Sequence, residues 1–317
     1  ANLIKLPFKV VILDGGSDPA VERELLSGEK YNNVNYQYCR YPYDETYQDF
    51  YSKLASAFKH VTTDYVALAD NDDFFITKGL RESVDFLMKN PDYASCGGQT
   101  GGIFFKNKRN FEFGISSSAP KDINDKSAIE RVKKNFASYD VTYYDVHRSE
   151  QLKESFNKLK NLNPSDLFIH EIIVSSLAVA SGKTKKNNYL YLVRQNNSPG
   201  SVATSTQSNN NYFGRMFIDS WLKDFNNLSY AIVSALTKNN DNNENEAITL
   251  SINEFYKEFL LKNIHTDILK KIPFIKRNLI KYLMRDKISV EFTFRKIYSI
   301  FCRVRYKNGK VNMLGRL

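Results

Sequence analysis

The first 100 residues alternate between short apolar runs and amphipathic runs, and this alternation limits the possible folds more than any other feature of the chain. Strands that alternate with helices build a largely parallel sheet with helices on its faces. We therefore expect an α/β fold with a mixed, mostly parallel sheet flanked by helices. By hydrophobic periodicity, the expected strands are residues 8–14, 34–41 and 65–70, and the expected helices are 19–28, 47–60 and 77–89.

Beyond residue 90 the chain is predicted to continue the sheet and then to become helical. Short strands containing glycines are expected over 93–113, a strand entering a helix over 139–159, and a further strand over 187–195. Between the last two lies an apolar helix. Asn163 is predicted to be its N-cap, and Gly182 is predicted to close it.

Length and composition favour a division into two parts. With 317 residues, 42% of them hydrophobic, the chain can build one large domain or two modest ones. We expect a domain over 1–205 and a helical, basic C-terminal region over 206–317. The Asn-rich run at 237–247 is predicted to be a flexible connector within that region.

Acidic residues cluster where the strand-like run at 65–70 ends, and ligands of α/β sheets gather at such strand ends. In an extended chain, Asp70 and Asp72 project to the same side. Two close carboxylates repel each other unless a cation lies between them, and Mg²⁺ and Mn²⁺ prefer oxygen ligands. The run therefore predicts a divalent-cation site at Asp70 and Asp72. The alternative is an Asp-rich turn that caps the helix after Phe74 and binds no metal.

Other polar residues carry weaker signals. The four His residues are scattered, so no zinc site is expected, and His147 is interpreted as a structural residue. The glycine run "GGQTGG" at 97–102 lacks the Gly-Lys-Ser/Thr ending of a phosphate-binding loop. We expect it to permit tight strand turns or a close approach of the backbone to a ligand. Cys39, Cys96 and Cys302 lie far apart and are expected to be reduced thiols.

Three motifs together resemble the GT-A fold glycosyltransferases, especially those of the inverting family 2. They occur in the expected order over residues 8–205, and they read "FKVVILDGGSD", "DYVALADNDDFF", and "SDLFIHEIIVSSLAVASGK" followed by "YLYLVRQNNSPGSVATS". The resemblance implies a GT-A-like, Rossmann-related fold. It also implies transfer of a sugar, with inversion, from a nucleotide-sugar donor to a saccharide or lipid-linked saccharide acceptor, with Mn²⁺ or Mg²⁺ as cofactor.

The resemblance gives roles to residues at the strand ends. It implies that Asp14 faces the base or ribose of the nucleotide, that Asp70 contacts the ribose side, and that Asp72 together with Asp70 holds the metal on the diphosphate. In the same pattern Asp73 is a substitute ligand or a helix cap. Many relatives have a second Asp where this chain has Gly15, so the identity of the base stays open. Arg194 and the loop after it are interpreted as a lid that reaches the diphosphate, or else as a plain surface loop.

An inverting transfer needs a general base that takes the proton of the acceptor hydroxyl. The family pattern places an acid at the entrance of the apolar helix, so Glu171 is our first choice and Asp166 our second. His170 titrates near neutral pH and is a third choice. The alternative is that Asp166 only complements the helix N-terminus and that the other two lie on the wetter face of the helix.

The resemblance also indicates a missing segment. Family members begin with a strand and a helix before the segment that here begins at Phe8, whereas "ANLIKLP" reads as the last turn of such a helix. We therefore expect this sequence to lack the first strand and helix of the family, and with them part of the nucleotide pocket.

Positive charge is concentrated at the C-terminal end. Residues 257–317 hold sixteen Lys and Arg against four acidic residues, so the rest of the chain is slightly negative although the total is +10. Apolar and basic residues mix at 272–287, as in a helix at a membrane interface or in a packed helix with a solvated face. No run approaches about 20 apolar residues, and no secretory leader is recognisable. We expect a cytoplasmic protein that contacts the anionic inner face of a membrane peripherally.

Two other functions stay open at this point. The basic, aromatic segment "FTFRKIYSIFCRVRYK" at 292–307 also fits a nucleic-acid-associated binding module. Against that reading, the acidic strand ends would repel nucleic acid phosphates. A non-catalytic subunit that keeps the fold and has lost the donor site is the third possibility.

Overall fold

The computed structural model describes residues 8–28, 30–31, 34–105, 111–115, 121–139, 141–196, 220–237 and 242–271. Its strands are β1 (Val10–Asp14), β2 (Tyr36–Arg40), β3 (Tyr65–Val66), β4 (Phe74–Phe75), β5 (Tyr93–Phe105), β6 (Phe111–Ile115), β7 (Val146–Arg148) and β8 (Lys183–Asn196). Its helices are α1 (Pro19–Ser27), α2 (Tyr47–Ala57), the 3-10 helix η1 (Phe58–His60), α3 (Thr77–Lys89), α4 (Ala128–Ala137), α5 (Ser149–Leu162), α6 (Leu167–Ser181), α9 (Trp221–Leu236) and α10 (Asn242–Lys271).

Two compact units make up the chain, Ala1–Asn263 and Ile264–Leu317, and the fold and site described below belong to the first. The predicted division into 1–205 and 206–317 stays a prediction. Residues 242–247, which were expected in a flexible connector, lie in α10 instead. None of the described helices is long and apolar enough to cross a bilayer, and the amphipathic run at 272–287 lies outside the described residues.

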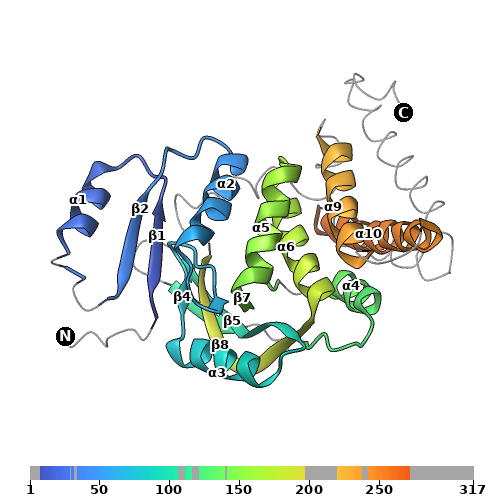
Figure 1. Ribbon diagram of the computed structural model, residues 1–317, viewed down its shortest axis with the longest axis horizontal. Helices are drawn as coiled ribbons and strands as arrows, with labels where there is room; N and C mark the ends of the chain where they lie inside the picture. The colour runs from blue at the N-terminus through green and yellow to red at the C-terminus, as the bar shows by residue number, and fades with distance from the viewer. Residues whose placement is uncertain are drawn as a thin grey trace. The chain divides into compact units, whose positions relative to one another are not determined.

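The strands form a two-stranded sheet and a six-stranded sheet (Figure 1). In the small sheet, β1 and β2 are parallel. In the large sheet, β5 is parallel to β8 and antiparallel to β6 and β7, while β3 and β4 form antiparallel pairs with β7 and β8. The expected α/β class with a mixed sheet flanked by helices is confirmed. Its parallel character comes from the two long ladders, β1–β2 and β5–β8, because every other described pair is antiparallel.

The strand expected over 65–70 is much shorter than predicted. β3 contains only Tyr65 and Val66, which pair with Arg148 and His147, and its partner β7 begins at Val146, one residue before the partner of Val66. The chain after Val66 therefore leaves the sheet four residues before the acidic cluster. Among the described residues β2 is the sole partner of β1, and the expected absence of an earlier family strand stays a prediction.

Helix α6 is the centre of the core. Figure 1 shows it beside α5, with α4 and α9 on its other sides. Its side chains Ile172, Ile173 and Val174 are almost completely buried, as expected for a helix that is apolar all round. Because packing on every side fixes this helix, the polar residues of its first turns have fixed positions as well.

The ends of α6 are capped by side chains. Asp166, and not Asn163 as predicted, is the N-cap, and its Oδ1 accepts a hydrogen bond from the backbone N of Phe168 at 2.8 Å. Asn163 instead follows α5 as its C-cap, with a left-handed φ of 47° that Asn tolerates better than most residues. At the other end Gly182 closes the helix as predicted, and buried Arg131 donates to the carbonyls of Val179 and Ala180, at 2.7 and 3.0 Å.

Candidate functional site

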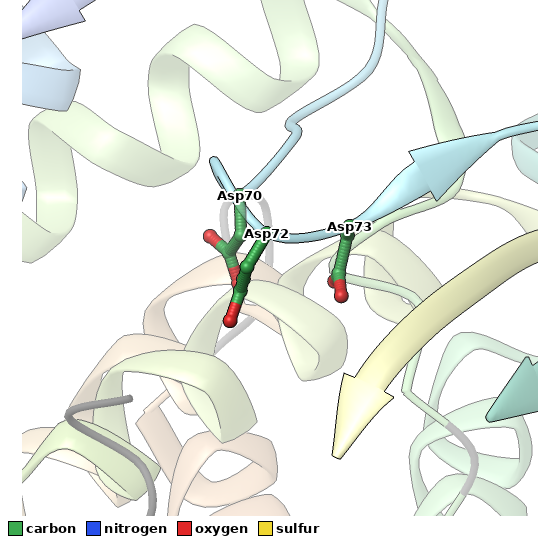
Figure 2. Close-up of side chains that lie close together, drawn as sticks. All are labelled: Asp70, Asp72 and Asp73. Atoms are coloured by element: carbon green, nitrogen blue, oxygen red, sulfur yellow. The ribbon is translucent and has the colours of Figure 1, made fainter. Parts of the chain in front are cut away.

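Three carboxylates converge in the turn between β3 and β4. Asp70, Asp72 and Asp73 each place one carboxylate oxygen within 4.8 Å of the other two. Figure 2 shows the side chains of Asp70 and Asp72 pointing the same way, with Asp73 next to them just before β4. The backbone N of Asp73 approaches the carbonyl of Asp70 at 3.4 Å. The predicted convergence is present, but a turn produces it and not the alternation of a strand.

Arg194 on β8 reaches this acidic cluster. Its Nε lies 3.0 Å from Oδ2 of Asp73, and its Nη2 lies 3.7 Å from Oδ2 of Asp70. The phenol of Tyr144 donates to the same oxygen of Asp70 at 2.6 Å and accepts from Arg194 Nη2 at 3.1 Å. The guanidinium carbon is 4.6 Å from the centroid of the Tyr144 ring. The loop after Arg194, interpreted from the sequence as a lid, lies outside the described residues.

Burial controls the protonation of this cluster. The side chain of Asp73 is 1% exposed. Burial raises the pKa of Asp73 to about 6, Arg194 opposes that shift, and the charges of Asp70 and Asp72 add to it. Burial also raises the pKa of Tyr144, which keeps its phenol protonated and able to donate to Asp70.

Glu171 lies in the second turn of α6, within electrostatic reach of the cluster. Burial raises the pKa of Glu171; Arg194 lowers it, Asp70 raises it, and a hydrogen bond from Tyr139 lowers it. The phenol of Tyr139 is 3.5 Å from Glu171 Oε1 and 3.4 Å from Ser175 Oγ. A carboxylate with a raised pKa is a stronger base, so this position suits proton abstraction. The assignment of Glu171 as the base stays a prediction.

The other two proposed bases have structural contacts. His170 is 1% exposed, stacks on Tyr51 with ring centroids 3.8 Å apart, and donates through Nδ1 to the carbonyl of Asp166 at 2.8 Å. Burial lowers the pKa of His170 to about 4, so it is uncharged at neutral pH. The backbone N of Asp166 donates to Asp224 Oδ2 on α9 at 3.1 Å. These contacts hold the start of α6 in place, and a role of either residue as base stays a prediction.

Asp14, at the end of β1, belongs to a separate polar group. Its Oδ2 accepts hydrogen bonds from Tyr38 Oη at 2.6 Å and Arg40 Nη1 at 2.7 Å, and its Oδ1 accepts from the backbone N of Gly16 at 2.8 Å. Burial works to raise the pKa of Asp14, but the hydrogen bonds from Tyr38, Gly16 and Arg40 outweigh it and hold the pKa below its ordinary value. Asp14 is therefore ionised at neutral pH.

The turn after Asp14 has room for a second acidic side chain only if the side chains of Asp44 and Lys53 move. A Cβ at Gly15 would lie 2.5 Å from Asp44 Oδ2 and 2.7 Å from Lys53 Nζ. Asp44 and Lys53 form an ion pair in this position, and the Lys53 side chain is 7% exposed. Where many relatives have a second Asp, this chain therefore has a glycine, and the ammonium group of Lys53 lies in the space that the side chain would enter.

Sequence reasoning missed the tyrosines of the site. Tyr144 lies in the run "YDVTYYDVHR", which was interpreted as a strand entering a helix. Tyr38 was likewise assigned only to a strand. Tyr38 could have been found by pairing the two predicted strands in parallel, because that register places Arg40 opposite Asp14 and Tyr38 two residues before it. No sequence signal identifies Tyr144, since its partner Arg194 is 50 residues away.

Comparison with known families bears on the N-terminal part of the chain. Residues 1–132 match the sequence model of Glycosyl transferase family 2. The predicted resemblance to the family 2 glycosyltransferases, with its GT-A-like α/β class, is confirmed for this segment. The family 2 segment includes Asp14 and the acidic cluster at 70–73, whereas Glu171 and Arg194 lie beyond it. No curated protein matches the chain significantly.

Solved structures give more distant similarities. The S. aureus TarS 1-349 structure has 12% sequence identity and a TM-score of 0.48, covering 88% of this chain and 71% of that one. The same protein in complex with UDP has 11% identity and a TM-score of 0.40, with coverages of 100% and 87%. The mannosyltransferase PcManGT from Pyrobaculum calidifontis, in complex with GDP-Man and Mn²⁺, has 12% identity and a TM-score of 0.40, with coverages of 94% and 77%. Likenesses of this degree support no inference about function.

Proposed function

We propose that this chain is an inverting glycosyltransferase that moves a sugar from a nucleotide-sugar to a saccharide or lipid-linked saccharide, with Mn²⁺ or Mg²⁺ as cofactor. The observation that carries the proposal is the convergence of Asp70, Asp72 and Asp73 within 4.8 Å of one another, in a segment that matches glycosyl transferase family 2. Three carboxylates so close together repel one another unless cations lie among them.

The donor set fits a hard divalent cation. Carboxylate oxygens are the ligands that Mg²⁺ and Mn²⁺ prefer. Because Asp73 is already paired with Arg194, Asp70 and Asp72 would hold the cation. A bound divalent cation would neutralise the charge on a departing nucleoside diphosphate. Arg194 would supply a second positive charge for the same diphosphate.

Glu171 would act as the general base. In the proposed reaction the acceptor oxygen bonds to the anomeric carbon, the bond from that carbon to the diphosphate oxygen breaks, and the hydroxyl proton passes to Glu171. The raised pKa of Glu171 supports this role. Asp166 and His170 are weaker proposals, since both are engaged in the contacts that begin α6.

The donor nucleotide would contact Asp14. Its ionised carboxylate accepts hydrogen bonds, so it suits the hydroxyls of a ribose or the N–H groups of a base. Tyr38 and Arg40, which now donate to Asp14, would orient it. The base itself, and the sugar attached to the diphosphate, are left to experiment.

The basic C-terminal region would hold the enzyme at the anionic cytoplasmic face of a membrane, within reach of a lipid-linked acceptor. This part of the proposal depends on residues 257–317, in which Lys and Arg outnumber acidic residues four to one. Deletion of 272–317 is expected to abolish binding to anionic vesicles. Loss of RNA or DNA binding in its place would favour the nucleic-acid-associated module.

The test of the proposal begins with the donor. Thermal shift with UDP, GDP and CMP in the presence of Mn²⁺ identifies the nucleotide, because a ligand stabilises the fold it binds. Release of that nucleotide from its common sugar conjugates is then measured. Asp72→Asn should lower turnover by about 100-fold or more, and EDTA should abolish it.

Asp85→Asn is the matched control for this test, because Asp85 is an exposed acid on α3. Its turnover should equal that of the wild-type chain. If Asp72→Asn and the wild-type chain turn over equally, the metal role is wrong. If no nucleotide stabilises the chain at all, the non-catalytic subunit is the better description.

A further inference from the structure

The hydroxyl of Tyr144 lies between Arg194 and Asp70 and contacts both of them. Its hydroxyl proton is directed at Asp70 Oδ2, and its oxygen accepts from Arg194 Nη2. A hydroxyl has one proton and two lone pairs, so these two hydrogen bonds have a fixed direction. The uncharged hydroxyl of Tyr144 is thus the hydrogen-bond donor to Asp70 and the hydrogen-bond acceptor for Arg194.

The guanidinium of Arg194 lies closer to Asp73 than to Asp70. It contacts Asp73 at 3.0 Å but remains 3.7 Å from Asp70, which is too far for a hydrogen bond. Arginine usually forms short, bidentate contacts with a nearby carboxylate. Here the phenol of Tyr144 takes up the Nη2 group that would otherwise turn to Asp70.

The position of Tyr144 is itself fixed. It is 9% exposed, and its ring carries the guanidinium of Arg194 on one side. Its backbone carbonyl accepts a hydrogen bond from Tyr191 Oη at 2.9 Å, and the ring of Tyr143 meets it edge-on with centroids 5.0 Å apart. The phenol therefore has little freedom to move out of the way of Arg194.

We propose that Tyr144 is a positioning residue that keeps Arg194 on Asp73 and so reserves Asp70, with Asp72, for a divalent cation. The inference rests on the proposed metal role of the cluster. An Arg–Asp70 ion pair would place a positive charge on an oxygen that the cation needs. Without the phenol, the guanidinium and the cation compete for the same carboxylate.

A purely structural role for Tyr144 predicts a different effect of its replacement on metal affinity. If Tyr144 only fills space, replacing it by Phe lowers stability but leaves metal affinity unchanged. If it positions Arg194, the same change weakens metal binding, and removal of Arg194 in that background reverses the effect. The double variant thus separates the two roles.

The experiment measures Mn²⁺ binding by electron paramagnetic resonance of the free ion, without nucleotide. Tyr144→Phe should bind Mn²⁺ about tenfold more weakly, since a hydrogen bond to a charged group contributes on this scale. Tyr144→Phe with Arg194→Gln should return to within about twofold of the wild-type affinity, because the competing guanidinium is gone. Tyr189→Phe is the matched control, since its hydroxyl contacts Ser83 and the Gly79 carbonyl on α3. It should bind Mn²⁺ as the wild-type chain does.

The outcomes distinguish this inference from the proposed function. If the folded wild-type chain binds no Mn²⁺, the metal role fails and the inference fails with it. If the wild-type chain binds Mn²⁺ and Tyr144→Phe binds it equally well, the inference alone is overturned. Should Tyr144→Phe not fold, Arg194→Gln decides by itself: Mn²⁺ affinity within about twofold of wild type supports the inference, because Tyr144 already keeps the guanidinium away from Asp70. Binding several-fold tighter than wild type would mean that Arg194 competes for Asp70 in spite of Tyr144, and would overturn it.

Discussion

At the scale of single residues, a carboxylate is given its role by its surroundings. Asp14 is ionised because three donors surround it, whereas burial raises the pKa of Glu171 and of Asp73. These environments support the different roles proposed for the three residues: contact with polar groups of a ligand for Asp14, the general base for Glu171, and a partner of Arg194 for Asp73. Residue type alone does not distinguish these roles, because the environments depend on residues remote in the sequence.

Replacement of Glu171 tests the proposed base. Glu171→Gln keeps the size of the side chain and an acceptor for Tyr139, but it cannot take a proton. Transfer to acceptor should fall by about 10²- to 10⁴-fold, while Mn²⁺ and nucleotide affinity change less than about twofold. Because the pKa of Glu171 is raised, wild-type transfer should fall on acidification at a pH above the ordinary range of a glutamate.

The control for this variant is Glu258→Gln, which changes an exposed glutamate on α10. Transfer rates measured with the identified donor should match the wild-type rates. Equal rates for Glu171→Gln and wild type would remove Glu171 from the reaction and leave Asp166 as the next residue to test.

At the scale of elements, the acids were predictable from the sequence and their geometry was not. The strand-to-helix alternation predicted α3 over the same residues, 77–89, that the structure shows. The strand before the acids was overestimated, because nothing local shows that β7 offers β3 only two residues to pair with. Asp70 and Asp72 still converge, because the turn after β3 brings their carboxylates together. From the sequence, the alternation of side chains along a strand was expected to do this.

The α6 helix shows the same limit. Its apolar composition predicted a buried helix, and Gly182 was correctly predicted to close it. Its start was misplaced, because Asn163 and Asp166 are both good caps and only the tertiary contact decides between them. Asp224 on α9 accepts hydrogen bonds from the backbone N of Ser165 at 3.0 Å and of Asp166 at 3.1 Å, which fixes the beginning of the helix from 58 residues away.

The glycines of β5 give a prediction about elements. A Cβ at Gly97 would lie 2.0 Å from Asp145 Oδ1, and that carboxylate forms a buried ion pair with Lys186 Nζ at 2.8 Å. Gly97→Ala should therefore displace the pair and lower the free energy of unfolding by about 3 kcal/mol. Urea denaturation followed by circular dichroism measures the loss.

Gly114→Ala is the matched control for this prediction. Gly114 is exposed on β6, and the nearest heavy atom to its added Cβ is Phe104 Cε2 at 4.0 Å. The free energy of unfolding should change by less than about 0.5 kcal/mol. Equal effects of the two variants would mean that the ion pair adjusts to the methyl group, and that the glycine is not required there.

At the scale of the whole molecule, stability should depend on pH through buried histidines. Burial lowers the pKa of His147 to about 4 and that of His170 to about 4, from an ordinary 6.5. Between pH 4 and pH 6.5, therefore, these two histidines are protonated in the unfolded chain but not in the folded chain. Each histidine therefore makes its full contribution to the free energy of unfolding above about pH 6.5. As the pH falls toward 4, the free energy of unfolding decreases by about 2–3 kcal/mol for each histidine.

Asp73 acts in the opposite direction over much of this range. Its pKa of about 6 in the folded chain lies above the ordinary 3.8, so the folded state binds its proton first and gains stability as pH falls from 6 toward 3.8. The pH dependence of the wild-type chain therefore contains opposed contributions from these groups. A single stability curve therefore does not isolate the histidines.

A variant comparison does isolate them. His147→Gln keeps a donor for the Thr142 carbonyl, which His147 Nε2 contacts at 2.7 Å, but it removes the titrating ring. The variant should be less stable than wild type at pH 7.5, and the gap should narrow by about 2–3 kcal/mol between pH 6.5 and pH 4.5, because only the wild-type chain then loses the histidine contribution. Urea denaturation at half-unit pH intervals gives both curves. A gap that stays constant over this interval would mean that His147 is protonated in the folded chain as readily as in the unfolded one, and that the enclosure of its ring by the core is less complete than its 2% exposure implies.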